Sequence, residues 1–372
     1  MTAFSVSRQL LSDALSVVSR AVSSRTALPV LEGIRITAAS NGTLTLTGYD
    51  LELGISTVIE AVVESPGELV LGARMLLDIV RRMPEERVSF KADDKFLTEI
   101  HSGSTEFTIL GFSAEEFPDF PAVEEADSFD ISQLLLREMI GQTLYAVATA
   151  DAKPVHTGSL FDIKNSVLNL VSVDGYRLAL CSEAVSSDRD LRFIVPGKAL
   201  GEVSRILSDD DEQTVGLHIS RRHITFKMGG FLVVSRLLEG EFLDYRAAIP
   251  GGFTTEVKVG VRAFSDCIER ASLLINDRIK SPLRVAFEDG DVKINCQTAL
   301  GKAYDEMRAV QNGENVEIGF NNRYLLDALR ASGCDEVRLE ISGPLSPMKM
   351  RPVEGDAFTF LVLPVRLQRT AD

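Results

Sequence analysis

A threefold internal repeat constrains the fold of this chain more than any other feature. Pro29, Pro154 and Pro282 each precede a strand pattern, a tight turn and a second strand pattern. These prolines are almost evenly spaced, at close to one third of the 372 residues. A repeat of this length is a whole folding unit, so the sequence predicts three equivalent domains in succession.

Helical patterns recur with the same period, two in each repeat. Apolar residues at intervals of three and four mark these segments, whereas the strand patterns alternate. Each repeat reads as helix, several strands with tight turns, helix and more strands, so the predicted fold class is α+β. The six expected helices are 8–20, 74–83, 131–145, 198–207, 262–271 and 322–331. The predicted domains are 1–124, 128–250 and 253–372.

Positive charge is concentrated in the expected helices, although the whole chain is acidic. They contain twelve Lys or Arg and seven Asp or Glu, a sum of +5, so the rest must sum to −20 to give the formal charge of −15. Arg74 and Lys198 occupy the same place in the second helix of their repeats, and Arg323 lies within one residue of it. One interpretation is a shared basic surface. The other is that Arg and Lys simply favour solvated helix faces.

The acidic balance argues against a protein that grips nucleic acid, because such affinity comes from basic residues that displace phosphate counterions. A protein threaded by DNA needs only a mildly positive lining, and an acidic exterior would discourage side-on binding. The longest apolar runs fall short of the roughly 18 to 20 residues that cross a bilayer. We therefore expect a soluble, cytoplasmic protein without a membrane partner.

The sequence carries no recognisable motif for catalysis, metal binding or cofactor binding. It lacks the familiar phosphate-binding glycine loops and the nucleophile elbow. The run Asp209 to Glu212 follows a helix and is interpreted as a solvated turn. Asp50 and Asp174 occupy equivalent repeat positions, which indicates a hydrogen bond to a backbone turn. The four cysteines are single and the four histidines lack ligand spacing, so we predict buried thiols and neither metal nor cofactor.

Seven segments occur in the order and spacing of one known family. They are LPVLEGIRI, LTGYDLELGI, VDGYRLAL, RFIVPGKAL, FLDYRAAIP, IGFNNRYLLDAL and LVLPVRL. Over nearly all of its length the chain resembles the bacterial β sliding clamps, the processivity subunits of replicative DNA polymerase. The resemblance implies a non-catalytic head-to-tail homodimer that encloses duplex DNA without sequence preference. Helices would line the hole, with antiparallel sheets outside. The implied further partners are a clamp loader and the replicative and repair polymerases, which bind through short peptides.

The resemblance also implies three sets of site residues. A pocket for partner peptides would contain Val173, Gly175, Tyr176, Arg177, Leu178, Leu243, Ala248, Asn321, Tyr324, Leu361, Leu363, Pro364, Val365 and Arg366. DNA would be faced by Arg25, Arg74, Arg81, Lys153, Lys198 and Arg205. At the dimer interface, Phe107 and Ile109 of one subunit would meet Leu273 and Leu274 of the other.

The pocket departs from the family at four positions. Leu243 stands where a proline is usual, Tyr176 where a histidine is common, and Leu363 and Val365 where methionines often occur. Leu and Val are stiffer than Met, so we expect an altered affinity for individual peptides. Two other functions fit the sequence less well: an enzyme of nucleotide metabolism with an unrecognised site, and a repeat scaffold that does not bind DNA. The first would need one cluster of polar residues that breaks the threefold pattern, and the second leaves the basic helices without a purpose.

Overall fold

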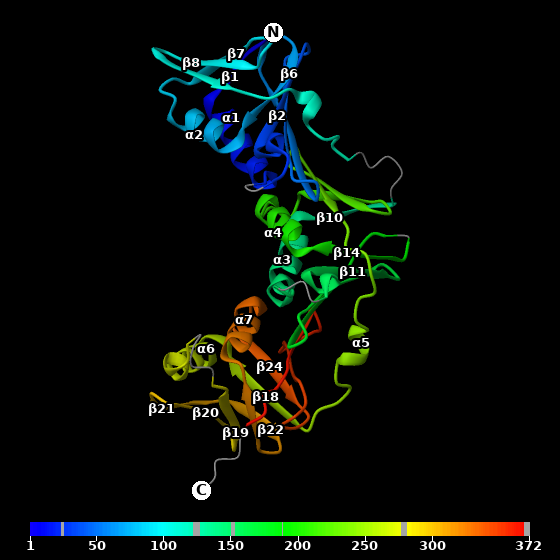
Figure 1. The fold of residues 1–372 in the computed structure, drawn as a ribbon. Helices are drawn as coiled ribbons and strands as arrows, with labels where there is room; N and C mark the ends of the chain where they lie inside the picture. Colours follow the sequence, from blue (N-terminus) through cyan, green and yellow to red (C-terminus); the bar gives the residue numbers. More distant parts are fainter. Residues whose placement is uncertain (24–25, 122–126, 150–152, 188, 277–280, 368–372) are drawn as a thin grey trace. The chain divides into compact units, whose positions relative to one another are not determined.

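The computed structural model describes all residues except 24–25, 122–126, 150–152, 188, 277–280 and 368–372 (Figure 1). Contacts divide the chain into two compact units. The first unit contains Met1–Leu135 and Glu202–Leu237, and the second contains Leu136–Gly201 and Leu238–Asp372. The described α-helices are α1 (Arg8–Val18), α2 (Ala73–Arg82), α3 (Gln133–Thr143), α4 (Gly197–Ile206), α5 (Tyr245–Ala248), α6 (Val261–Ala271) and α7 (Asn322–Ser332).

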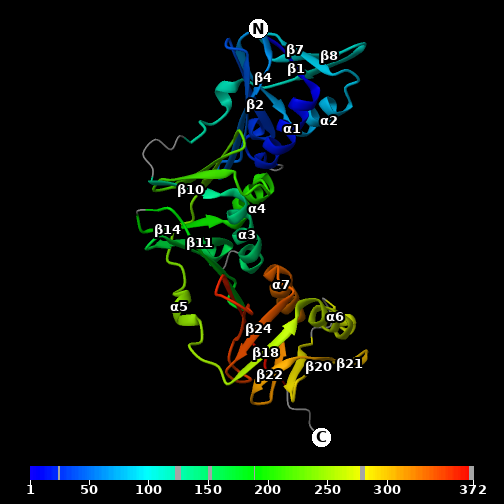
Figure 2. The ribbon, with the colours of Figure 1, turned by 180° about the vertical axis from the view of Figure 1, so that it is seen from behind.

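The first unit is built on two antiparallel sheets. One has the strand order β5-β1-β7-β8-β9, and the other has the order β10-β15-β16-β17-β4-β3-β2-β6. Helices α1 and α2 pack side by side in this unit (Figures 1 and 2). The strands are β1 (Thr2–Ser7), β2 (Gly33–Ala39), β3 (Thr43–Tyr49), β4 (Leu53–Glu60), β5 (Val62–Ser65), β6 (Gly67–Gly72), β7 (Arg87–Ala92), β8 (Leu97–Ser102), β9 (Thr105–Leu110), β10 (Asp127–Ser132), β15 (Thr214–Ile219), β16 (His223–Met228) and β17 (Phe231–Arg236).

The second unit also has two antiparallel sheets, of orders β14-β11-β12-β13-β26-β25-β24-β18-β22 and β21-β20-β19-β23. Both views place α3 and α7 on one side of the longer sheet and α5 on the other (Figures 1 and 2). The strands are β11 (Gly158–Lys164), β12 (Val167–Val173), β13 (Arg177–Ala184), β14 (Leu191–Pro196), β18 (Thr255–Gly260), β19 (Leu283–Glu288), β20 (Asp291–Thr298), β21 (Gly301–Arg308), β22 (Val310–Gly313), β23 (Val316–Phe320), β24 (Glu336–Ile341), β25 (Met348–Pro352) and β26 (Phe358–Val362).

The long sheets are continuous across sequence repeats. In the first unit β4 pairs with β17, where Ile55 lies opposite Val233. In the second unit β13 pairs with β26, where Leu178 lies opposite Leu361. Each pairing joins a strand of one repeat to a strand of the next, so hydrogen bonds within each sheet hold neighbouring repeats together.

The predicted α+β class and the six predicted helices are confirmed, and α5 is an additional short helix. Each repeat also begins with a strand, β1, β10 or β18, that the sequence reasoning missed. Ile131 lies in β10, although the sequence predicts that it begins a helix. The chain is extended there because it pairs with β7 or β15, and Ser7 then accepts a hydrogen bond from Leu10 N at 3.5 Å to start α1.

Two leucines lie outside the fully buried faces of their helices. Leu10 in α1 is 41% exposed, and in α3 Leu135 is only half-buried beside the fully buried Leu136. Within the described residues, no helix combines the length and the apolar character needed to span a membrane.

The predicted solvated turn is confirmed, and three of the four cysteines are buried as predicted, whereas the prediction is wrong for Cys334. Asp210, Asp211 and Glu212 are exposed after α4. Three cysteines, Cys181, Cys267 and Cys296, are buried free thiols, whereas Cys334 is half-buried. Burial raises the pKa of the Cys181 thiol to about 12, which leaves it protonated and unreactive at neutral pH.

Candidate functional site

Two segments of the second unit that are far apart in the sequence form one surface. Strands β13 and β26 pair so that Arg177 lies opposite Val362 and Leu178 opposite Leu361. The pairing continues beyond β26, because Leu363 N donates to the carbonyl of Tyr176 at 2.9 Å. The structure therefore brings VDGYRL and LVLPVRL together, as their predicted common site requires.

A tight turn presents the first of these segments. Asp174 Oδ1 accepts hydrogen bonds from Tyr176 N at 2.8 Å and Arg177 N at 3.0 Å. Between them Gly175 adopts φ +93°, a conformation that favours glycine. The turn is held by its own aspartate, which is the backbone role predicted for Asp174.

The same turn recurs in the first repeat, at Asp50. Its Oδ1 accepts from Glu52 N at 3.0 Å and from Leu53 N at 2.7 Å, which confirms the predicted equivalence of Asp50 and Asp174. Leu51 there has φ 76°, which a side chain adopts only with strain of about 1 to 3 kcal/mol. The second repeat avoids this strain with Gly175, and Tyr176 beside it is 61% exposed.

Arg177 connects the turn to helix α7. Its Nε donates to Asp174 Oδ2 at 3.0 Å, and its Nη1 donates to Asp327 Oδ2. Burial acts to lower the pKa of the guanidinium, but the hydrogen bonds and negative charges of Asp327 and Asp174 outweigh it and raise the pKa. Arg177 therefore stays charged, is largely buried and links two carboxylates.

Aromatic rings surround the Arg177 guanidinium. The Arg177 guanidinium carbon lies 4.6 Å from the ring centre of Tyr324 and 5.3 Å from that of Tyr145. Tyr176 and Tyr324 are stacked with their ring centres 6.0 Å apart. Burial raises the pKa of both Tyr145 and Tyr324, so these phenols stay neutral. The cation and the rings fix one another and give this side of the surface a rigid aromatic wall.

An apolar floor lies on the face of the sheet that α5 covers. Four members of this buried cluster are predicted pocket residues or their strand neighbours: Val173, Leu178, Leu361 and Leu160. Phe242 and Tyr245, from the segment around α5, pack on the same cluster, with Ala248 beside them. Leu243 is 42% exposed at its margin. The floor is covered by the segment around α5.

His156 is a neighbour of the site that the sequence reasoning missed. It is buried, and its ring meets Phe242 edge to face with centres 5.4 Å apart. Burial, with the charge of Lys153, lowers the pKa of His156 and keeps it neutral. It helps to line a cavity of about 650 Å³ together with Val147, Ala148, Thr149, Lys153, Asp174, Gly175, Tyr176, Arg177, Arg323, Tyr324 and Asp327.

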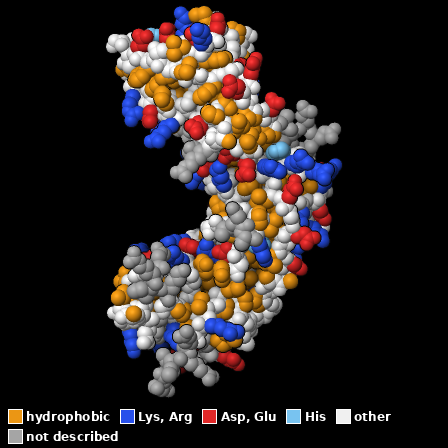
Figure 3. Space-filling model, in the orientation of Figure 1, with side chains coloured by type: hydrophobic (Ala, Val, Ile, Leu, Met, Phe, Trp, Pro, Cys, Tyr) orange, Lys and Arg blue, Asp and Glu red, His pale blue; other side chains and the backbone are white. Residues whose placement is uncertain are grey.

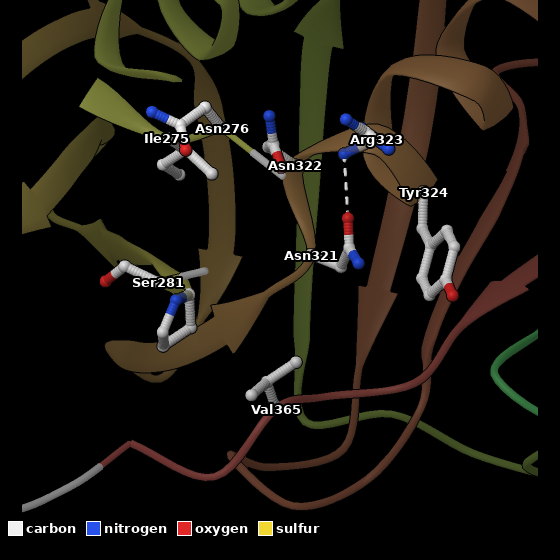
Figure 4. Close-up of a pocket in the computed structure, with 9 residues that line it drawn as sticks. Ile275, Asn276, Ser281, Asn321, Asn322, Arg323, Tyr324 and Val365 are labelled. Atoms are coloured by element: carbon white, nitrogen blue, oxygen red, sulfur yellow. Dashed lines mark hydrogen bonds between the residues drawn. The ribbon is translucent and has the colours of Figure 1, made fainter. Parts of the chain in front are cut away.

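On the other side of Tyr324 lies a cavity of about 450 Å³ (Figure 4). Asn321 lies at its rim and caps α7, because its side-chain oxygen accepts from Arg323 N at 2.9 Å. Val365 reaches the opposite wall, where Val365 N donates to Gly319 O at 2.8 Å. A Cβ on Gly319 would lie 2.4 Å from Val365 O, so only glycine at this position allows the C-terminal segment around Val365 to pass so close to β23. Pro364 is half-buried and Arg366 is exposed.

Two of the residues expected to face DNA, Arg74 and Lys198, lie at helix starts, and Arg81 and Arg205 lie in the last turns of the same helices. Arg74, Lys198 and Arg323 are each the second residue of α2, α4 and α7, which removes the one-residue offset of the sequence comparison. All three are exposed, as are Arg81, Lys153 and Arg205. Arg205 pairs with Glu202. Arg25 lies outside the described residues.

The helices keep a positive sum with their observed bounds. Leaving α5 aside, they contain eleven basic and seven acidic residues, which gives +4. Acidic and basic side chains are interspersed over the face seen in Figure 3. On that face the positive excess of the helices does not form a broad single-sign surface.

The four predicted interface residues lie at or near exposed sheet edges. Phe107 and Ile109 belong to β9, and Phe107 is 40% exposed. Leu273 follows α6 and is 83% exposed. Leu274 instead packs against the core of its own unit. Leu273 thus presents far more free apolar surface than Leu274.

Comparison with known proteins identifies one family along the whole chain. Three family models match in succession, the N-terminal, central and C-terminal domains of DNA polymerase III beta subunit, at residues 2–121, 130–244 and 246–366. The beta sliding clamp of Bacillus subtilis is 33% identical, with 98% of this chain and 99% of the relative covered.

Solved structures agree. The crystal structure of the Bacillus subtilis DNA polymerase sliding clamp matches with a TM-score of 0.95 at 32% identity, covering 99% of this chain and 100% of the other. The Pseudomonas aeruginosa sliding clamp bound to griselimycin matches with a TM-score of 0.92 at 30% identity, covering 98% and 100%.

Proposed function

Because the chain belongs to the DNA polymerase III beta subunits, the non-catalytic sliding clamps of processive DNA synthesis, we propose that two copies close head to tail into a ring around duplex DNA. The proposal assigns DNA to the inside of the ring and polymerases to a groove on its second unit. The observation that carries it is the recurrence of exposed basic residues at the start of one helix in each repeat.

Ring closure is supported by the two short sheets. Among the described residues, β9 pairs only with β8 and β21 only with β20, so each presents one open edge. Phe107 and Leu110 are exposed on β9, and Leu300 and Tyr304 are exposed on or beside β21. Open apolar edges are avoided in monomers, because they recruit other strands. We propose that β9 of one copy lies against β21 of the next, with Leu273 beside this seam.

The DNA contact follows from the helix charges. Arg74, Lys198 and Arg323 occupy the same helix position in three repeats, so a dimer would offer six such cations. Arg81, Arg205, Lys153 and Arg25 are proposed to add to them. Contacts to phosphate alone carry no sequence information. The expected binding is therefore non-specific and weak unless the ring is closed.

The groove on the second unit suits an extended peptide. Leu363, Leu243 and Ala248 are partly exposed above the buried floor of Val173, Leu178 and Leu361. Tyr176, Tyr324 and Val365 lie at the rim. A few apolar anchors usually carry most of such binding energy. We propose that replicative and repair polymerases and the clamp loader dock here through short peptides with leucine or phenylalanine anchors and a glutamine. The griselimycin-bound relative supports a ligand site in this family.

Light scattering tests the assembly directly. The chain has a mass of 40.7 kDa, and a closed dimer should have twice that mass. The mass of a single chain at micromolar concentration would contradict the ring.

A further inference from the structure

The segment Leu238 to Pro250, here called the strap, crosses the outer face of the long sheet of the second unit through α5. Hydrogen bonds to backbone groups of the strap hold both of its ends. Leu238 N donates to Ile194 O at 2.9 Å, and Lys349 Nζ donates to Pro250 O at 3.3 Å. Between these points Phe242 and Tyr245 are buried on the apolar floor.

One carboxylate holds the middle of the strap. Asp162 lies in β11 and is 7% exposed. Its Oδ2 accepts from Tyr245 OH at 2.6 Å and pairs with Arg246 Nη2 at 2.9 Å. The Arg246 guanidinium also lies 4.7 Å from the ring centre of Tyr245. Two consecutive strap residues thus converge on a single buried oxygen.

Asp162 lies at the margin of an apolar cluster. Asn169 and Arg192 are directly opposite it in the sheet, whereas Leu160 and Ile194 further along the same face are apolar. A buried charge is costly unless it is paired, and an apolar residue at 162 would leave the buried Tyr245 hydroxyl without its acceptor. The hydrogen bonds to the carboxylate fix the position of the strap along the sheet, whereas apolar contacts alone would allow the strap to slide.

The strap residues on either side of this anchor are those proposed above to flank the peptide groove. Leu243 lies two residues before Tyr245, and Ala248 lies two residues after Arg246 within α5. Leu243 and Ala248 are too close to Tyr245 and Arg246 in the chain to move independently of these two residues. We infer that Asp162 is a positioning residue for the peptide groove: through Tyr245 and Arg246 it sets the strap where Leu243 and Ala248 can contact a bound peptide. The inference rests on the peptide-binding function proposed above.

The test uses the full-length dimer and a fluorescent peptide carrying glutamine, leucine and phenylalanine. Asp162→Asn keeps an acceptor but removes the charge, Tyr245→Phe removes only the hydroxyl, and Arg246→Ala removes the exposed partner. Each should weaken Kd by about tenfold, mainly through faster dissociation, since a charge-assisted hydrogen bond is lost. Asp162→Asn combined with Arg246→Ala should be no weaker than either single change, because both act through one contact.

Hydrogen exchange separates positioning from general stability. Amides of residues 241–249 should exchange faster in the variants, while those of β12 and β26 and the melting temperature stay near wild type. Arg82→Ala is the matched control, because Arg82 forms an exposed pair with Asp78 on α2 of the first unit. It should leave both readouts unchanged.

The outcomes are distinct. Wild-type Kd in all three variants would overturn the inference, as would faster exchange and lower melting temperature throughout the second unit, which would make Asp162 merely structural. Strictly additive losses in the double variant would also overturn it. If the wild-type protein itself fails to bind the peptide, the proposed groove fails first and the inference with it.

Discussion

At the scale of single residues, the groove depends on buried polar groups that act on exposed neighbours. Arg177 holds the turn at Asp174 to helix α7, and Asp162 holds the strap through Tyr245 and Arg246. Sequence resemblance could predict Arg177, because it lies inside a recognisable motif. Asp162 could not be predicted, since its partners Tyr245 and Arg246 lie far away in the sequence and no local pattern signals a buried carboxylate.

Arg177→Ala should abolish peptide binding while the fold and the dimer persist. Loss of the guanidinium leaves Asp174 and Asp327 without their counter-charge and frees Tyr324, whereas the turn is still closed by Asp174 to backbone amides. Fluorescence anisotropy should show no binding of the labelled peptide at protein concentrations that saturate it with the wild type. Deletion from Leu363 onward should have the same effect, because it removes the contacts to Tyr176 O and Gly319 O. Tight binding by both proteins would show that the groove lies elsewhere.

Acid should destabilise the folded chain as the pH falls below the ordinary histidine pKa of about 6.5. Burial lowers the pKa of His156, His218 and His223, so the unfolded state takes up protons first as the pH falls. Their contribution is fully present above the unfolded value of about 6.5 and is lost as the pH falls through the folded pKa. Calorimetry should show a lower Tm at pH 5.5 than at pH 7.5, with a smaller difference in His156→Leu. An identical pH dependence in both proteins would exclude His156 as a contributor.

At the scale of elements, the sequence was most informative where structure is local. Helix starts and hairpin turns followed from short patterns; Asp289 and Gly290, with φ 53° and 87°, form the turn predicted for the third repeat. The strand β1 was missed because its six residues merge with the apolar stripe of α1. The pairing of β13 with β26 has no local signal, so the site it creates required a known family or a structure.

The proposed dimer interface is formed by whole elements, the strand edges and the residues that follow α6. Leu273→Ala should weaken the dimer without changing the stability of the monomer, because its side chain is 83% exposed in the single chain. Leu274→Ala should also lower the monomer Tm, since Leu274 packs on its own core. The double variant should be monomeric by light scattering, because each buried leucine typically contributes about 2 to 5 kcal/mol. A double variant that keeps the mass of a dimer would place the seam elsewhere.

At the scale of the whole molecule, the repeat and the charge distribution support one account. The chain has a net charge of −15, so tight electrostatic adhesion to DNA is not expected. Its helices nevertheless carry a net positive charge, which suits a loose lining around DNA. A ring of this kind is retained by topology, and its residence on DNA should depend on whether the DNA has ends.

The most direct measurement is retention on nicked circular DNA before and after linearisation. Labelled protein loaded onto the circle should co-elute with DNA in gel filtration at moderate salt, and a single restriction cut should release it as a free dimer. Release requires no change in protein or salt, only a DNA end, so it isolates topology from phosphate contact. Protein that stays bound to the linear DNA with free ends at the same salt would contradict the closed ring and indicate direct gripping.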